Sequence, residues 1–504
     1  MPELLTDQLR TMARLHGDEV AYANLDAGTS VSFAQWEQES NRLARGLIGA
    51  GVAKGDRVSI YLPADQVLRW VVAYAAVHKA GAVAVPTNTR LTPVELATIL
   101  AHAEARAAVT DLSLLPTLSL VVTTDAAAPP DEAGAPGDGA GSVVAWPDLL
   151  DPDGGEIQVD LSDDDLADIM YTSGTTGSPK GVVVRHRNVS LLPNGEPPWS
   201  GTSWLHGSPL FTFAGIAFIY NPMKLGMGAL FLPRFDAGRW LSFVAERRPA
   251  AVFLVPAMAQ LILGHPDFDT ADLSSVSMCA LGSAPVAPET LRRFQARLLH
   301  ATVSNGYGMT EAGPAYCAVP KDEAQRRVGS VGKPMPPMEV RIAGDGGEPV
   351  EAGEVGEVLI RMAGRQREYY RDPEATARTW SGGWLHTGDL GRLDKDGYLY
   401  IVGGKKEVII RGGNNIYATD VEAVLLEHPS VLEAAVVGVA HEVLGEDVAA
   451  FVVLRPDGDT TPEALRAFCS ERLADYKVPR QVRFLNELPR NATGKVIKHQ
   501  LTVE

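Results

Sequence analysis

Cysteine is scarce in this sequence. Three cysteines, Cys279, Cys317 and Cys469, lie far apart among the 504 residues. Their spacing predicts neither a disulfide framework nor a zinc site, and it is typical of a protein that works in a reducing cytoplasm. The eleven histidines also lack the spacing of metal ligands.

Positive charge is scarce as well. The chain has 45 Lys and Arg against 62 Asp and Glu, which leaves a net charge of −17, and it contains no block of basic residues. We therefore expect no nucleic-acid partner. If so acidic a chain binds an anion, it must gather backbone N–H groups and lysines at one place, so a loop that does this is of interest.

Long apolar runs are missing. No apolar stretch is long enough to span a bilayer. The first residues, MPELLTDQLRTMARLHGDEV, carry acids early and have no apolar segment of the kind found in signal peptides. We expect no transmembrane segment and a cytoplasmic location.

The patterns that are present predict a layered α/β fold. Apolar residues make up 45% of the chain, which is enough for two or more domains. In the first third, helical patterns at 33–51 and 67–81 each precede a short strand pattern, at 57–63 and 82–88. Such repeats favour parallel sheet. The Pro/Gly-rich stretch 124–142 is predicted to be a surface loop.

The composition changes near residues 390–405, where charges, turns and short strands gather. The residues beyond have the pattern of a compact helix–strand–strand unit. We place a domain boundary at Gly403-Gly404. The prediction is a large N-terminal domain of layered α/β sheets, 1–402, followed by a small α+β C-terminal domain, 403–504.

One loop combines the groups that bind anions. In IMYTSGTTGSPKGVV (169–183), hydroxyls and glycines separate two apolar strands and lead to Lys180. A plain turn needs no ligand, and a short Gly/Thr loop met alone is usually that. The alternative is a phosphate site made of amides, hydroxyls and a lysine. The spacing differs from the P-loop, because Gly174 and Gly177 are three apart and Pro179 precedes the lysine.

Four further stretches accompany this loop: ALGSAPV (280–286), SNGYGMTEAG (304–313), GGWLHTGDLG (382–391) and LPRNATGKV (488–496). Each alone is a turn or an exposed lysine. Together with RGGNNIYATDVE (411–422), and in this order, they resemble the acyl-adenylate-forming superfamily of acyl-CoA synthetases, adenylation domains and luciferases. The resemblance covers essentially the whole chain, and the architecture is similar to that of free-standing acyl-CoA ligases.

The resemblance implies a two-step reaction. A carboxylate attacks the α-phosphate of Mg-ATP to give acyl-AMP and pyrophosphate, and the thiol of CoA then displaces AMP. The implied partners are a small-molecule carboxylic acid, ATP and CoA, with Mg²⁺ as the metal. The implied catalytic residues are Lys495, which stabilises charge in the first step, Thr175 in the loop, and Glu311, which holds the metal. A homodimer is left open.

The resemblance also implies which residues contact the nucleotide. The phosphates are assigned to Thr172, Ser173, Gly174, Thr175, Thr176, Gly177 and Lys180. The wall between nucleotide and acyl group is assigned to Gly282, Ser283 and Ala284. The adenine is assigned to Asn305, Gly306, Tyr307, Gly308, Met309 and Thr310. Asp389 is assigned to the ribose hydroxyls, and Lys495 to the α-phosphate.

The acyl pocket is assigned to the segment PLFTFAGIAF (209–218). Its implied lining is Phe211, Thr212, Phe213, Ala214 and Ile216, with Gly282, Gly306 and Gly308. The segment holds no Asp for an α-ammonium group and no Arg for a second carboxylate. We therefore expect an apolar monocarboxylic acid, whether fatty, aryl or ring-bearing.

In this family the C-terminal domain is mobile and swings between two poses. One pose presents Lys495 to ATP, and the other turns Arg411, Gly412 and Gly413 toward the path of pantetheine as a CoA tunnel. Gly403 and Gly404 are the implied hinge. The chain departs from its relatives at two places, with Gly404 where an Arg is common and Thr212 where a His is common.

Other functions stay open at this point. An adenylating enzyme could deliver its acyl group to a carrier-protein thiol or to a nitrogen nucleophile instead of CoA. A non-catalytic nucleotide-binding protein is disfavoured, because Lys180, Glu311, Asp389 and Lys495 are all present.

Overall fold

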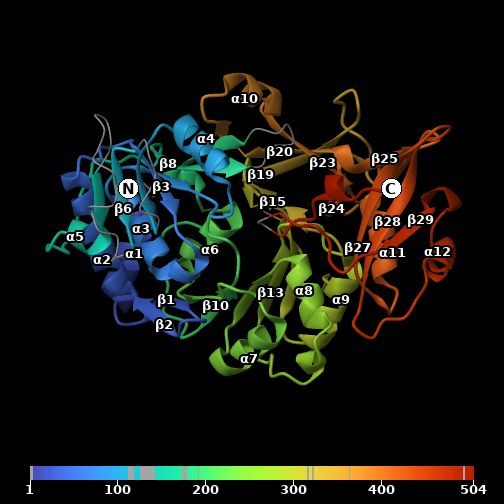
Figure 1. Ribbon diagram of the computed structural model, residues 1–504, viewed down its shortest axis with the longest axis horizontal. Coiled ribbons are helices and arrows are strands. Elements are labelled where there is room, and N and C mark those ends of the chain that lie inside the picture. The colour runs from blue at the N-terminus through green and yellow to red at the C-terminus, as the bar shows by residue number, and fades with distance from the viewer. Residues whose placement is uncertain are drawn as a thin grey trace. The chain divides into compact units, whose positions relative to one another are not determined.

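The computed structural model describes residues 4–111, 118–124, 142–172, 179–190, 192–314, 317–320, 323–362, 364–491 and 494–503 (Figure 1). The chain folds as two compact units. One contains residues 1–234 and 365–377, and the other contains 235–364 and 378–504. Among the helices that the structure describes, none combines the length and apolar character needed to cross a membrane.

The first unit contains an eight-stranded sheet in the order β21-β9-β8-β4-β3-β5-β6-β7. Its strands are β21 (Glu368–Tyr369), β9 (Lys180–Arg185), β8 (Leu166–Thr172), β4 (Val83–Pro86), β3 (Arg57–Tyr61), β5 (Ala105–Thr110), β6 (Leu120–Thr123) and β7 (Ser142–Ala145). The strands from β8 to β7 are parallel, whereas β9 and β21 are antiparallel additions. The predicted parallel sheet is therefore confirmed.

Helices of this unit follow the predicted patterns. The main ones are α1 (Leu5–His16), α2 (Phe33–Gly49), α3 (Val67–Lys79) and α4 (Pro93–Ala103). Ser32 begins α2 with a reciprocal capping box to Gln35. Helix α3 is buried on nearly every side and packs within the main core of the unit. Most of the predicted loop 124–142 lies outside the described residues, and Ser142 already begins β7.

The same unit holds a second set of paired strands, β10, β11, β1 and β2. They comprise β10 (Ser203–His206), β11 (Gly228–Phe231), β1 (Val20–Asn24) and β2 (Thr29–Ser32). Helix α6 (Phe213–Lys224) lies between β10 and β11 in the sequence, and the short α5 (Trp146–Leu149) follows β7. Side chains from β1, β2 and β11 and from α1, α2, α3 and α6 share one core.

The second unit begins with three parallel strands, β12 (Ala251–Leu254), β13 (Met278–Gly282) and β14 (Thr302–Gly306). The helices of this region are α7 (Ala237–Arg247), α8 (Pro256–Leu263) and α9 (Pro288–Arg297). An antiparallel sheet follows, made of β19 (Met338–Ala343), β20 (Gly356–Met362), β22 (Trp380–Ser381), β23 (Trp384–Leu393) and β24 (Leu399–Gly404). Helix α10 (Pro373–Thr379) precedes β22.

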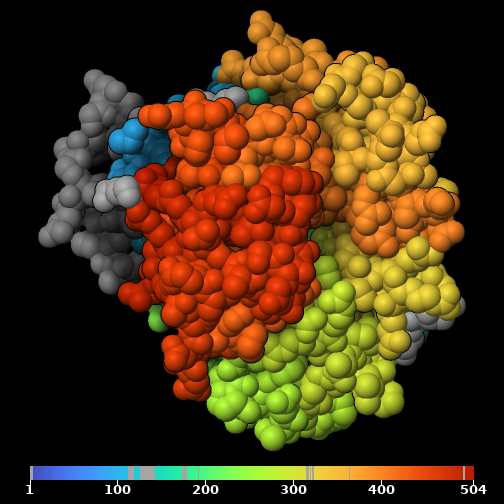
Figure 2. Space-filling model, turned by 90° about the vertical axis from the view of Figure 1, so that its right-hand side faces the viewer, coloured from blue at the N-terminus to red at the C-terminus, as the bar shows by residue number. Residues whose placement is uncertain are grey.

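The last hundred or so residues form a small α+β region with its own core, and Figure 2 shows their surface from orange to red. Its elements are β25 (Val408–Arg411), β26 (Asn414–Tyr417), α11 (Ala418–Leu426), β27 (Val431–His441), β28 (Gly445–Leu454), α12 (Pro462–Ser470) and β29 (Gln481–Phe484). The predicted fold class, a large α/β part and a smaller α+β C-terminal part, is therefore confirmed. The boundary between residues 402 and 403 stays a prediction.

Candidate functional site

The predicted phosphate loop joins two paired strands. Strand β8 ends at Thr172, which pairs with Lys180 at the start of β9. Of the predicted phosphate contacts, Ser173, Gly174, Thr175, Thr176 and Gly177 lie outside the described residues. The Lys180 ammonium lies 4.9 Å from the centre of the Tyr369 ring, a cation–π contact made by strand β21. The two ends of the predicted loop are thus placed side by side.

Two neighbouring parallel strands of the second unit end at glycines. Gly282 at the end of β13 pairs with Gly306 at the end of β14. A Cβ atom on Gly282 would lie 2.8 Å from the Gly306 carbonyl oxygen, so the strands can approach this closely only with glycine at 282. Ser283 follows with φ +68°, and Ala284 is half-buried. The carboxyl edge of parallel strands is where α/β sheets bind ligands.

The adenine motif folds as a tight antiparallel turn after β14. Gly308 and Met309 pair with Pro314 and Gly313, respectively. The Ala312 amide donates to the Met309 carbonyl at 3.1 Å, which places Thr310 and Glu311 within the turn, both half-buried. On the strand before it, the Asn305 side-chain amide donates to the Gly329 carbonyl at 3.3 Å.

Tyr307, Asp389 and Lys495, predicted from three separate motifs, come together in the second unit. The Tyr307 hydroxyl donates to Asp389 Oδ2 at 2.7 Å. Burial raises the pKa of the Asp389 carboxyl, and the Tyr307 hydroxyl and the Lys495 ammonium both act to lower it. Burial and the neighbouring carboxylate raise the pKa of Tyr307. The phenol therefore stays neutral and remains a donor.

Lys495 is exposed at the end of a turn with fixed geometry. The Asn491 side-chain oxygen accepts from the Lys495 amide at 2.9 Å, and the Lys495 carbonyl accepts from the Asn491 amide at 2.9 Å. Gly494 has φ +82°, and its carbonyl accepts from Arg490 at 2.7 Å. These bonds tie the backbone of Lys495 to Asn491, and the lysine side chain is left exposed to solvent.

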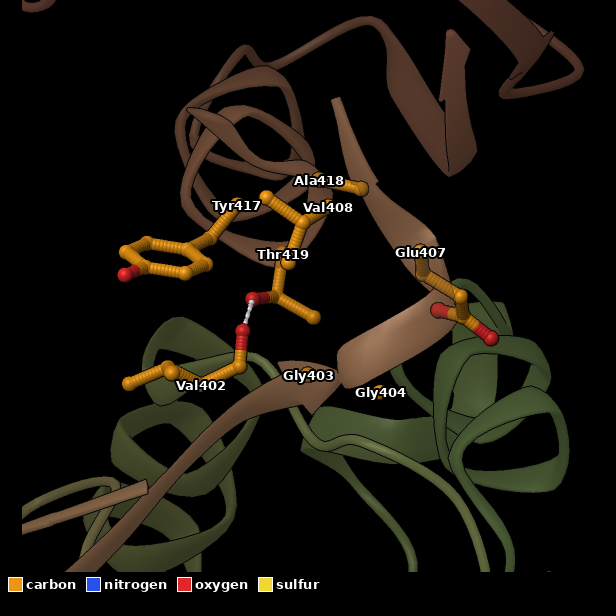
Figure 3. A pocket seen from close by; sticks show the side chains of 8 residues that line it. All are labelled: Val402, Gly403, Gly404, Glu407, Val408, Tyr417, Ala418 and Thr419. Carbon is orange, nitrogen blue, oxygen red and sulfur yellow. Dashed lines mark hydrogen bonds between the residues drawn. The ribbon is translucent and has the colours of Figure 1, made fainter. Parts of the chain in front are cut away.

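The predicted hinge lies next to Asp389. In the β23–β24 pairing, Gly404 is the partner of Asp389 and Gly403 is the partner of Leu390. The Thr419 hydroxyl at the start of α11 donates to the Val402 carbonyl, and Figure 3 shows this bond beside the two glycines. A small hollow here is lined by Val402, Gly403, Gly404, Glu407, Val408, Tyr417, Ala418 and Thr419.

Lys405 directly follows Gly404, which stands where the resemblance leads one to expect an Arg. Its ammonium pairs with the Glu357 carboxylate at 3.2 Å. Glu357 also lies 3.7 Å from His386 and accepts from the Gly388 amide. The charge of Lys405 is therefore partly neutralised by a neighbouring carboxylate.

The predicted CoA-tunnel residues form a hairpin turn. Arg411 pairs with Asn414, so the loop between β25 and β26 consists of Gly412 and Gly413 alone. Their φ values of +58° and +83° are those of a type I′ turn, which accounts for both glycines. Arg411 donates to Asp447 Oδ1 at 2.7 Å. The tunnel assignment stays a prediction.

The predicted acyl segment begins helix α6. The Thr212 hydroxyl accepts from the Gly215 amide at 3.0 Å and donates to the Pro209 carbonyl at 2.7 Å, so it caps the helix. Phe211, Phe213 and Ala214 are half-buried, whereas Ile216 is 1% exposed and belongs to the core. The Arg367 guanidinium lies 4.8 Å from the Phe213 ring, a contact that local sequence patterns did not predict.

No group of three or more His, Cys, Asp and Glu that could hold a metal exists among the described residues. Among the described residues, Glu311 could therefore share a metal with at most one further His, Cys, Asp or Glu. A Mg²⁺ ion bound through one carboxylate and substrate phosphates needs no more than that.

Comparison with known proteins covers nearly the whole chain. A family model described as AMP-binding enzyme matches residues 9–370, and one described as AMP-binding enzyme C-terminal domain matches residues 420–495. A feruloyl-CoA synthase from Amycolatopsis sp is 36% identical over 485 residues, 94% of each chain. The long-chain-fatty-acid–CoA ligase FadD13 of Mycobacterium tuberculosis is 32% identical over 497 residues, 97% of this chain and 96% of its own.

A solved structure shows the same architecture. The crystal structure of the anthranilate CoA ligase AuaEII in complex with anthranoyl-AMP aligns with a TM-score of 0.86 and 26% identity. The alignment covers 99% of this chain and 96% of that one.

Backbone conformation at the two adjacent glycines predicts different tolerance to a side chain. Gly403 has φ +135°, where an L side chain is strained by about 1–3 kcal/mol, although the nearest atom to a new Cβ is 3.7 Å away. Gly404 has φ −82°, and a Cβ there would make only ordinary contacts with Glu407. Gly403→Ala should lower the melting temperature, and Gly404→Ala should leave it nearly unchanged. Circular-dichroism melts measure both, and equal melting temperatures would contradict this backbone geometry.

Proposed function

The chain belongs to the AMP-binding enzyme family, and we propose on that premise that it activates an apolar monocarboxylic acid as acyl-AMP and transfers the acyl group to CoA. The observation that carries the proposal is the Tyr307–Asp389 hydrogen bond in a chain with full-length similarity to CoA ligases. The charge of Lys495 acts on the same carboxyl, lowering its pKa. ATP and CoA are the other two substrates of this acyl-CoA ligase reaction.

The chemistry requires positioning and positive charge. A carboxylate is a poor electrophile, and forming a mixed anhydride with phosphate supplies a good leaving group. Because the carboxylate and the phosphate are both anions, stabilising the developing charge is the main task of the first step. A cation about 4 Å away contributes roughly 4 kcal/mol at an effective dielectric near 20, which is about a thousandfold in rate. We assign this role to Lys495.

The remaining nucleotide contacts are those that the family resemblance implies. We propose that Tyr307 stacks on the adenine and that Asp389 accepts hydrogen bonds from the ribose hydroxyls. Lys180 and the residues from Thr172 to Gly177 would contact the β- and γ-phosphates, and Gly282 to Ala284 would separate nucleotide from acyl group. Glu311 would hold Mg²⁺, which offsets phosphate charge when bound.

An apolar acid fits the composition of the acyl segment. The hydroxyl of Thr212 caps α6, so it adds no titratable group where relatives place a histidine. Aromatic and aliphatic side chains make up most of residues 209–218. Feruloyl-CoA synthase and FadD13 are named for aryl and long-chain fatty acyl groups, both monocarboxylates. We propose that the substrate belongs to this class.

The two-pose cycle remains a proposal for this chain. The C-terminal domain, residues 403–504, would move about Gly403 and Gly404, and Arg411, Gly412 and Gly413 would then line the path of CoA. We place the reaction in the cytoplasm, because all three cysteines are free thiols. A homodimer stays a prediction.

A panel of carboxylic acids tests the function. With Mg-ATP, an aryl or fatty monocarboxylate should cause pyrophosphate release, and CoA should be required for thioester and AMP release. Matched dicarboxylates and amino acids should be poor substrates. Acyl-AMP that is consumed by a carrier-protein thiol or an amine but not by CoA would favour the alternative acceptors. No pyrophosphate release with any acid would overturn the function.

Lys495→Ala should separate the two half-reactions. Adenylation should fall about a thousandfold, because the ammonium stabilises charge only in the first step, whereas thioester formation from supplied acyl-AMP should persist. Lys395→Ala, which removes an exposed lysine from the turn after β23, is the matched control. Single-turnover assays of each half-reaction give the readout, and an equal loss in both would show that Lys495 has another role.

A further inference from the structure

Residues 365–377 return to the first unit and run along strand β9, which begins at Lys180. Glu368 and Tyr369 pair with Val183 and Val182, and the Tyr370 amide donates to the Gly181 carbonyl at 2.7 Å. Arg185 forms an ion pair with Glu368 at 2.9 Å. This segment, which we call the strap, is therefore bonded to the strand that carries the phosphate-side lysine.

The strap places an aromatic ring against Lys180. The Tyr369 ring lies 4.9 Å from the lysine ammonium, and the residue is 9% exposed. The Tyr369 amide donates to Thr376 Oγ1 at 2.9 Å, which fixes the backbone on which the ring is carried. A lysine side chain has four flexible carbons, so a buried ring that attracts its ammonium restricts where the charge can be.

Two residues earlier, the strap contacts the acyl segment. Arg367 is 3% exposed, its guanidinium lies 4.8 Å from the Phe213 ring, and it donates to the Asn188 carbonyl at 2.6 Å. Phe213 is the first residue of α6, directly after the capping Thr212. One short segment thus touches both Lys180 and an aromatic residue of the acyl segment, Phe213.

We propose that Tyr369 and Arg367 are positioning residues that set the Lys180 ammonium and the Phe213 ring for the adenylation step. This inference rests on the proposed function. Tyr369 acts through Lys180 on ATP, and Arg367 acts through Phe213 on the acid. The attraction is exerted by the face of the Tyr369 ring.

Substitutions at Tyr369 test whether its ring positions the Lys180 ammonium. Tyr369→Phe keeps the ring and should retain the wild-type KM for ATP. Tyr369→Leu keeps apolar bulk but removes the ring, and it should raise that KM about threefold to thirtyfold, with a smaller effect on the KM for the acid. In a Lys180→Met background, Tyr369→Leu should add less than about twofold, because the cation is already gone.

Substitutions at Arg367 test whether this residue positions Phe213, and they should affect the KM for the acid more than the KM for ATP. Arg367→Met should raise the KM for the acid more than the KM for ATP. Arg367→Lys keeps the charge but lacks the planar guanidinium that lies over Phe213. It should therefore restore the KM for the acid only partly. Thermal melts accompany every variant, and Arg367→Lys keeps the test informative if Arg367→Met fails to fold.

Calorimetry of ATP binding separates this inference from the proposed function. If wild type binds ATP but releases no pyrophosphate with any acid, the function is wrong, and the affinities of Tyr369→Leu and Tyr369→Phe still test the Lys180 contact. The inference is overturned if Tyr369→Leu binds ATP as wild type does, binds it more tightly, or weakens binding equally in the Lys180→Met background. It is also overturned if Arg367→Met leaves the KM for the acid unchanged in a folded protein.

Discussion

The carboxyl of Asp389 is the group on which the geometry of the candidate site depends. It accepts from the Tyr307 hydroxyl at 2.7 Å, and the Lys495 ammonium lies close enough to influence its pKa. Its backbone pairs with Gly404, one of the two predicted hinge residues. A carboxylate taken partly out of water is stable only when donors and cations surround it. Tyr307 and Gly404, from two separate predicted motifs, therefore both contact Asp389.

The chain has a net charge of −17, and the lysines of the proposed site differ in their surroundings. Binding ATP adds further negative charge, so lysines must be kept where the phosphates arrive. Lys180 is directed by the Tyr369 ring, which attracts the ammonium without neutralising it. Lys495 extends from a turn that Asn491 and Arg490 hold together. Lys405, by contrast, pairs with Glu357 and has its charge offset within the protein.

The sequence alone predicted what depends on local pattern. Helices 33–49 and 67–79, the strands after them and the small C-terminal α+β part follow from periodicity and glycine position. Contacts between distant residues carry no such signal. The capping role of Thr212 requires the helix start to be known, and the Arg367–Phe213 contact joins residues from separate elements. The adjacent glycines Gly412 and Gly413 are a local signal for a type I′ hairpin turn, whereas their role in a CoA tunnel rests on the family resemblance and stays a prediction.

The most direct test of the central claim is the affinity of Asp389→Asn for ATP, measured by calorimetry. Asparagine has nearly the same shape and can still accept from Tyr307, but it lacks the charge that we propose the ribose hydroxyls bind. Hydrogen bonds to charged groups contribute about 1.5–3 kcal/mol, so the account predicts an affinity loss of about tenfold to a hundredfold with an unchanged melting temperature. A folded Asp389→Asn protein that binds ATP as tightly as wild type would contradict it.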